Sequence, residues 1–163
     1  MSRAVKHKAV ATWLALFVGV FGVHRFYLHG LKDRWGWAFP LPTLLGLAGV
    51  QRMNTLGQDD RLAWLLIPLL GISLVAALLG GIVYGLMPDE RWNARFNPSG
   101  PQHRTGWPTV IGVIAALVIG AGVLMATIAF SAQRYFEYQV ELRAKAAQPA
   151  DAAAQRNSAK PTQ

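Results

Sequence analysis

Residues 62–87 read LAWLLIPLLGISLVAALLGGIVYGLM, a run without one charged side chain. A helix needs about 20 mainly apolar residues to cross the hydrocarbon core of a bilayer. This run exceeds that length, and three further runs lack charge almost entirely, at residues 9–23, 35–50 and 106–132. The pattern predicts an all-α integral membrane protein with four transmembrane helices arranged as two hairpins.

The two N-terminal runs are the shorter ones. Residues 9–23 reach spanning length only if residues 24–28 are counted with them. We expect the polar members of residues 24–28 to lie at the far headgroups. Residues 35–50 contain Pro40 and Pro42. Because proline removes a backbone donor, this helix is predicted to be short, kinked or partly re-entrant. A cleaved signal peptide is the alternative for the first run, but no small-x-small cleavage site precedes His24.

The 163-residue chain carries a formal net charge of +8 and contains no cysteine. Its cations lie between long uncharged runs instead of forming one stripe. Anionic lipid headgroups are therefore the expected partners, and nucleic acid is not. The missing cysteine excludes disulfides, thiolate metal sites and a cysteine nucleophile.

The distribution of Lys and Arg predicts how the chain is oriented, because cytoplasmic segments carry an excess of both. With four crossings and the N-terminus inside, ten of the 16 fall inside: Arg3, Lys6, Lys8, Arg52, Arg61, Arg134, Arg143, Lys145, Arg156 and Lys160. The other six fall outside: Arg25, Lys32, Arg34, Arg91, Arg95 and Arg104. Both termini are therefore predicted to be cytoplasmic.

The same pattern divides the chain into segments. We expect a basic N-terminus (1–8), a helical hairpin (9–50), a loop (51–61), a second transmembrane hairpin (62–132) containing a loop (88–106), a helical extension (133–148) and a disordered tail (149–163). In loop 88–106 basic and aromatic residues alternate between positions 91 and 96. That loop is expected to be a solvated connector or to lie on headgroups.

Small residues recur at every fourth position in three of the runs, a spacing that lets helices approach closely in lipid. They favour a bundle or self-association and carry no chemistry. The predicted helix-packing residues are Gly19, Gly22, Ser73, Ala77, Gly81, Gly85, Gly112, Ala116 and Gly120.

Residues 19–30 read GVFGVHRFYLHG. A basic pair there follows two glycines at the end of the first apolar run, and two aromatic residues come next. An Arg beside aromatic rings at headgroup depth can contact a lipid phosphate or a partner's carboxylate. The predicted lipid- or partner-contacting motif is therefore His24, Arg25, Phe26 and Tyr27. The alternative is that these residues only mark the membrane boundary.

This run resembles the signature of the TM-two (TM2) domain family, Gly-x-x-Gly-x-His-Arg-Phe-Tyr-Leu, over about residues 6–50. The resemblance implies two helices joined by a short loop and a membrane location. Similar bacterial proteins are inner-membrane proteins of unknown function, whereas animal relatives are linked to signalling and phagocytosis. The chain departs from the family at His29, where glycine is usual, and at residues 47–52, which replace a Trp-x-Leu-Ile-Asp ending.

All eight acidic residues fall in predicted loops or in the tail. Transporters normally keep ionisable groups at membrane depth, so active transport is disfavoured. His24 and His29 are five residues apart and share no helical face, which disfavours a metal site. No catalytic triad, phosphate loop or zinc-peptidase helix is present.

The sequence therefore predicts a multi-pass membrane protein without catalytic activity, cofactor or metal. It would contact anionic lipid, another membrane protein or a second copy through its hairpin and basic loops, in a bacterial inner membrane. The alternative is a membrane enzyme or lipid-handling factor whose site is formed by the outer loops. That alternative requires those loops to meet in one polar pocket.

Overall fold

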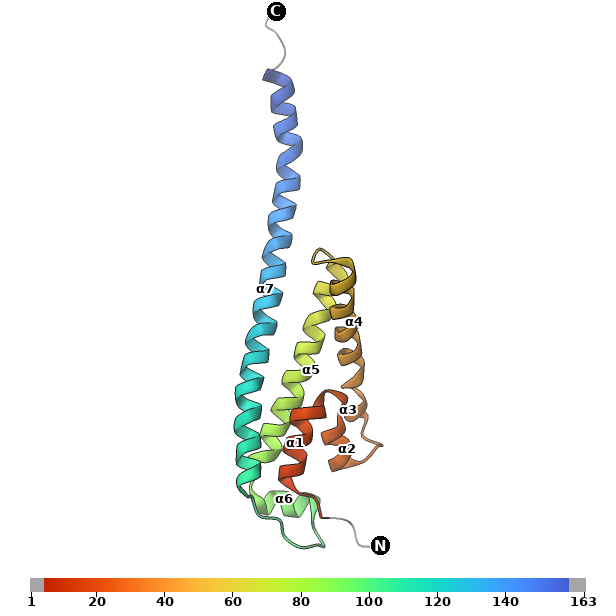
Figure 1. Ribbon diagram of the computed structural model, residues 1–163, viewed down its shortest axis with the longest axis vertical. Coiled ribbons are helices and arrows are strands. Elements are labelled where there is room, and N and C mark those ends of the chain that lie inside the picture. Colours follow the sequence, from red (N-terminus) through yellow and green to blue (C-terminus); the bar gives the residue numbers. More distant parts are fainter. Residues whose placement is uncertain (1–4, 159–163) are drawn as a thin grey trace, which may run out of the picture. The chain divides into compact units, whose positions relative to one another are not determined.

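The computed structural model describes residues 5–158, with side chains for residues 5–148, and this part of the chain contains helices and loops without a strand. The helices are α1 (Lys8–Val18), the short 3₁₀ helix η1 (Gly19–Phe21), α2 (Val23–His29), α3 (Arg34–Trp37), α4 (Pro40–Leu56), α5 (Arg61–Gly85), α6 (Asp89–Phe96) and α7 (Trp107–Ser158) (Figure 1). The all-α prediction is confirmed for these residues.

The chain divides into two compact units, unit 1 (1–127) and unit 2 (128–163), and α7 contributes to both. Unit 2 is helical as far as Ser158, so the helix continues beyond the expected end at residue 148. Residues 152–154 are all alanine, the strongest helix former, which offsets the break expected at Pro149. The tail prediction for residues 159–163 and the placement of Arg3 lie outside the described residues.

The first apolar run forms a hairpin that returns to the end of unit 1 where it began. Helix α1 ends at Val18, and α2 then runs back, so that the Lys6 ammonium donates to the Leu28 carbonyl. The backbone amide of His7 donates to the Tyr27 hydroxyl at 3.0 Å. This geometry does not support the expectation that residues 9–28 carry the chain to the far headgroups.

The short length of α1 and a glycine turn explain the reversal. Eleven residues rise about 16 Å, roughly half of a bilayer's hydrocarbon core. Gly22 then adopts a left-handed conformation with φ 74°. A side chain there would collide with the backbone of Gly36, so only glycine fits this turn.

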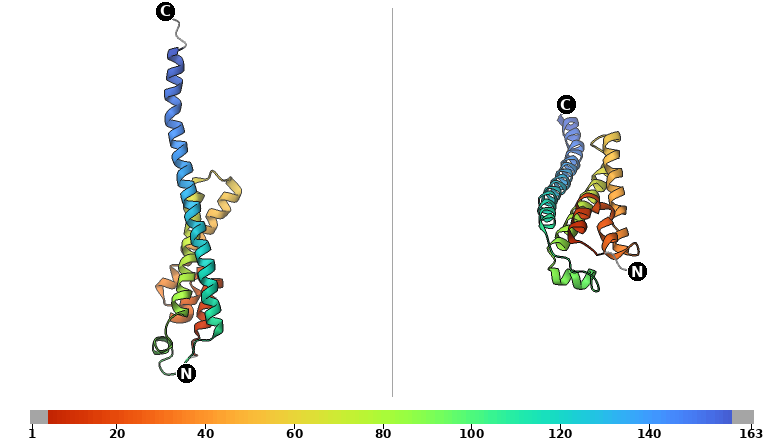
Figure 2. Two further views of the ribbon diagram at one scale, coloured as in Figure 1. Left: turned by 90° about the vertical axis from the view of Figure 1, so that its left-hand side faces the viewer. Right: turned by 60° about the horizontal axis from the view of Figure 1, so that its bottom comes forward.

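Helices α4 and α5 form the longer, antiparallel hairpin of unit 1 (Figure 2). Asp60 caps α5, because its carboxylate accepts from the Leu62 amide at 3.2 Å. The predicted second span is divided: α3 ends at Trp37, and α4 begins at Pro40, a position where proline fits a helix well. The prolines thus start α4 instead of kinking it.

Small residues let α1, α5 and the first part of α7 pack closely. Thr12 is fully buried and faces Gly81, Gly85 and Gly112. A Cβ at Gly81 would lie 2.9 Å from the Ala15 Cβ, closer than real Cβ contacts. Bulkier residues would therefore separate these helices.

Two helices are long and apolar enough to cross a membrane, Arg61–Gly85 and Trp107–Gln148. Only 28 % and 6 % of their most apolar windows are buried within the structure. The core helix of a soluble protein would bury such a stretch, so these faces suit contact with lipid. The apolar segment Lys8–Phe21 is shorter, which agrees with its hairpin geometry.

Candidate functional site

One end of unit 1 gathers three separate parts of the chain: residues 5–8, residues 25–34 of the hairpin, and residues 88–106. We call it the basic end. It has eight cationic side chains, Lys6, Lys8, Arg25, Lys32, Arg34, Arg91, Arg95 and Arg104, and three carboxylates, Asp33, Asp89 and Glu90. The opposite end, residues 52–61, has two cations and two carboxylates, Arg52, Arg61, Asp59 and Asp60.

The His24 side chain lies inside the bundle and is 1 % exposed. Its ring packs edge-on against Phe39 at 5.4 Å between centroids and lies close to Gly80 of α5. A Cβ at Gly80 would stand 3.1 Å from the His24 Nε2 atom. The prediction that His24 contacts lipid or a partner is therefore not supported, because α5 covers it.

The other three residues of the motif point in different directions. Arg25 donates to Asp33 at 2.7 Å, and this hydrogen bond lowers the pKa of the Asp33 carboxyl. Phe26 packs on Gly36 and Trp37, and Tyr27 binds the backbone of His7. The motif thus holds the hairpin and its following turn together, while Arg25 and Tyr27 stay partly exposed.

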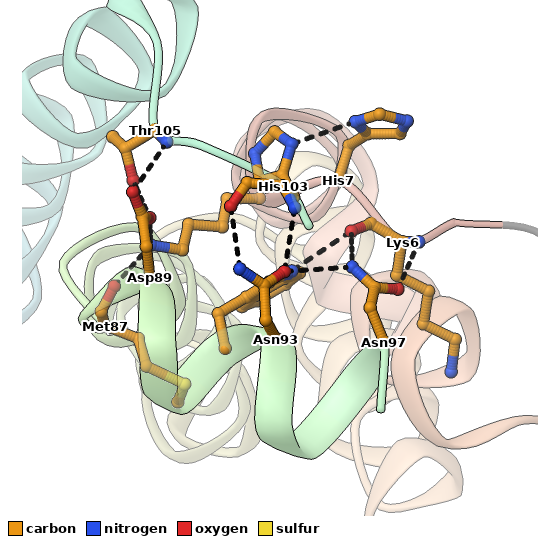
Figure 3. A network of polar contacts seen from close by, with 10 residues as sticks. Lys6, His7, Met87, Asp89, Asn93, Asn97, His103 and Thr105 are labelled. Atoms are coloured by element: carbon orange, nitrogen blue, oxygen red, sulfur yellow. Dashed lines mark hydrogen bonds and ion pairs between the residues drawn. The ribbon is translucent and has the colours of Figure 1, made fainter. Parts of the chain in front are cut away.

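Segment 88–106 is held on the N-terminal segment through a polar network (Figure 3). The Lys6 amide donates to Asn97 Oδ1 at 2.9 Å, and its carbonyl accepts from Asn97 Nδ2 and from Trp92 Nε1, each at 3.0 Å. Trp92 is fully buried. A solvated connector or a headgroup anchor is therefore the wrong description of Trp92, because α6 packs it inward.

Lys8 is buried although it is charged. Its ammonium donates to the Met87 carbonyl, to Asp89 and to the Thr105 hydroxyl, which satisfies all three of its protons (Figure 3). Hydrogen bonds from Lys8 and Thr105 hold the pKa of the Asp89 carboxyl well below its usual range. Because the partners are 81 positions apart in sequence, no local pattern indicated this pair.

Two histidines meet beside this pair. His7 and His103 place their Nδ1 atoms 3.1 Å apart, and Asn93 fixes the His103 backbone with bonds of 2.8 and 2.9 Å. Burial, followed by the neighbouring His7 and Lys8, lowers the pKa of His103, and Asp89 offsets only part of this effect. Within the described residues there is no group of three His, Cys, Asp or Glu that could hold a metal ion.

Hollows open at the basic end, and two of them concern segment 88–106 most directly. The first, which we call the Phe96 pocket, has a volume of about 650 Å³ and is lined by Val5, Lys6, Tyr27, Leu28, His29, Arg95, Phe96 and Pro98. The second, of about 530 Å³, is lined largely by polar residues of segment 88–106. The Phe96 pocket joins the hairpin to segment 88–106, so the two outer loops do meet.

The predicted packing residues lie mainly at helix contacts. Ser73, Ala77 and Ala116 are buried, and a Cβ at Gly19 would stand 2.8 Å from Ala77. Gly120 faces Leu78 at an ordinary contact distance. These positions explain the close approach of α1, α5 and α7 within unit 1.

Residues 4–52 match the family model of the TM2 domain. Neither a curated protein nor a solved structure gives a significant match. The matched residues cover α1, η1, α2, α3 and most of α4, and they end before α5. Residues 4–52 are therefore similar to a TM2 domain, and together with the two long apolar helices this match points to a membrane protein.

Proposed function

We propose that this TM2 domain-containing protein is a multi-pass, non-catalytic membrane protein that binds anionic lipid headgroups through its basic end. The observation that carries the proposal is the charge difference between the two ends of unit 1. The basic end has five more cations than carboxylates, whereas cations and carboxylates balance at the opposite end. A net positive surface at a membrane boundary attracts anionic lipid, and each Lys or Arg near the surface contributes about 1 kcal/mol.

The hairpin geometry supports three crossings instead of four. In our proposal α1 and α2 form a re-entrant hairpin, residues 35–51 make a broken crossing, and α5 and α7 make two more. The contact between Lys6 and Leu28 supports this path, because both ends of the hairpin then lie on one side. The N-terminus and the C-terminal part of α7 would lie on opposite sides of the membrane.

The positive-inside rule favours a cytoplasmic basic end. Among residues 5–148, eight cations lie there, against five on the other side: Arg52, Arg61, Arg134, Arg143 and Lys145. The N-terminus would be cytoplasmic, and the C-terminal part of α7 would not, in contrast to the prediction from four crossings. We infer a cytoplasmic (inner) membrane location, whose inner leaflet supplies anionic lipid.

Lipid retained by the purified protein tests the proposal. The full chain is placed in nanodiscs of zwitterionic lipid containing phosphatidylglycerol, and the bound lipid is counted by native mass spectrometry. The double variant Lys32→Gln/Arg104→Gln should retain about thirtyfold less phosphatidylglycerol. The matched control, Arg143→Gln/Lys145→Gln, removes the same charge beyond α7's apolar span and should have little effect. Equal losses in both variants would refute the proposal.

A membrane enzyme or lipid-handling factor is the second candidate, because the hairpin and segment 88–106 meet in one pocket. Burial favours a neutral His103 imidazole, the form that accepts a proton. Incubation of the protein with a mixture of phospholipids, followed by mass spectrometry, tests this candidate. A product that forms with the parent chain and is lost in His103→Gln would favour the enzyme over the binding protein.

A further inference from the structure

The Phe96 pocket is built from two parts of the chain that only the fold brings together. Tyr27, Leu28 and His29 come from the TM2 hairpin, whereas Arg95 and Phe96 come from α6, outside the residues that match the TM2 domain. Its volume of about 650 Å³ lies within the range of pockets that hold small molecules.

Two cationic groups are held beside one aromatic ring in this pocket. The Lys6 Nζ atom lies 5.8 Å and the Arg95 Cζ atom 5.5 Å from the Phe96 ring centroid. Both cations lie near the same ring, so an anion that enters the pocket would be attracted by each of them. The Arg95 guanidinium has a fork of N–H donors that matches the oxygens of a phosphate.

The wall of the pocket contains no carboxylate, since none of the residues that line it is acidic. One proton of the Lys6 ammonium is donated to the Leu28 carbonyl. The carboxylate next to it, Asp33, lies 3.8 Å from the His29 Nδ1 atom and already accepts a 2.7 Å hydrogen bond from Arg25. The pocket therefore offers positive charge and N–H donors without an internal counter-charge on its wall.

The pocket wall also has an apolar part, contributed by Val5, Leu28 and Phe96. A wall that combines cations with apolar side chains suits a phosphate attached to a glycerol backbone better than a bare ion. The pocket lies where the last residues of α2 and α6 meet, since the His29 and Phe96 ring centroids are 5.8 Å apart.

We propose that the Phe96 pocket binds the phosphate group of an anionic phospholipid, with Arg95 and Lys6 donating to its oxygens and Phe96 packing beneath. This inference rests on the proposed function and names a single place for it. In this proposal Arg95 and Lys6 form hydrogen bonds to one lipid, whereas the other exposed cations of the basic end attract the leaflet only through their charge.

Salt concentration separates the two kinds of contact. At about 0.5 M salt the Debye length falls to roughly 4 Å, so diffuse attraction is largely screened, whereas a hydrogen-bonded pair is not. The full chain in nanodiscs containing phosphatidylglycerol is compared with Arg95→Gln and with Arg91→Gln. Arg91 is the matched control because it lies on the same helix, carries the same charge and does not line the pocket.

The proposal predicts that at high salt Arg95→Gln still lowers retained phosphatidylglycerol about tenfold, and Arg91→Gln less than twofold. Equal effects of the two variants at high salt would refute the Phe96 pocket as a lipid site. The proposed function would still stand if the Lys32/Arg104 variant retained less lipid than its control. Unchanged melting temperatures show that both variants fold. Competition by soluble glycerol phosphate would support the phosphate site. Binding of glycerol phosphate without retention of the lipid would overturn the lipid assignment.

Discussion

The basic end and the opposite end of unit 1 have different kinds of ion pair. At the basic end Lys8 is buried and its ammonium has three acceptors, including Asp89. At the opposite end Arg52 pairs with Asp60 at 2.8 Å, and the Arg52 side chain is 41 % exposed. The comparison shows that the Lys8–Asp89 pair connects distant segments inside the fold, whereas the Arg52–Asp60 pair lies at an exposed turn.

The largest effect should come from Lys8→Met, which keeps the apolar stem and removes the charge. Asp89 and the Met87 carbonyl then lose their donor inside the structure. Because breaking a buried pair leaves an uncompensated charge, the free energy of unfolding should fall by about 3 kcal/mol. Unfolding in mixed micelles, followed by circular dichroism, measures this loss. A loss below about 1 kcal/mol would mean that the pair is no stronger than a surface one.

Gly81→Ala should follow in size, because the new Cβ would press on Ala15 of α1. We expect a loss of about 1–3 kcal/mol from overpacking. The control Gly122→Ala points into open space on α7 and should stabilise the helix by up to about 1 kcal/mol. Thermal melting of both variants in one detergent gives the signs. A stabilised Gly81→Ala would show that α1 does not pack on α5 here.

Acid should loosen the basic end before it affects the opposite end. The folded pKa of His103 is lowered, so the unfolded chain takes up the proton first and stability is lost as pH falls below about 6.5. Asp89, whose folded pKa is also lowered, adds a further loss below about pH 4. Hydrogen exchange of α6, corrected for intrinsic rates, should accelerate between pH 7 and 5, while that of residues 57–60 should not. His103→Gln should remove the acceleration; its persistence would assign the effect to another group.

Arg52→Gln should have the smallest effect. It breaks an exposed pair, for which the expected loss in the free energy of unfolding is about 1 kcal/mol or less. The same micelle titration as for Lys8→Met provides the measurement. A loss as large as that of Lys8→Met would remove the distinction between the two ends.

Local patterns in the sequence predicted the helical class and the close contacts of Gly81 and Gly85. These features depend on residues three or four positions apart or on the composition of one run. The sequence also contains the cations of the basic end, but the prediction placed them on two sides of the membrane, because it treated the first apolar run as a crossing.

The hairpin reversal and the buried pair could not be obtained in this way. Hydropathy is the same for an apolar run that crosses and for one that turns back. The sequence features that indicate a reversal are the short length of the apolar run, residues 9–23, and the glycine near its end, Gly22. Segment 88–106 is polar, so its packing through Trp92 had no periodic signature. The contacts of Lys8 and of Arg95 depend on distant segments, and composition does not predict them.

The most direct test of the account is the side of the membrane on which each end of the first hairpin lies. Because the chain has no cysteine, His7→Cys and Leu31→Cys provide single labelling sites before and after it. A membrane-impermeant thiol reagent, applied to intact cells and to inverted vesicles, reports the side of each site. The account predicts that both sites are labelled from the same side, in inverted vesicles. Labelling from opposite sides would establish a complete crossing and contradict the re-entrant hairpin on which the basic end depends.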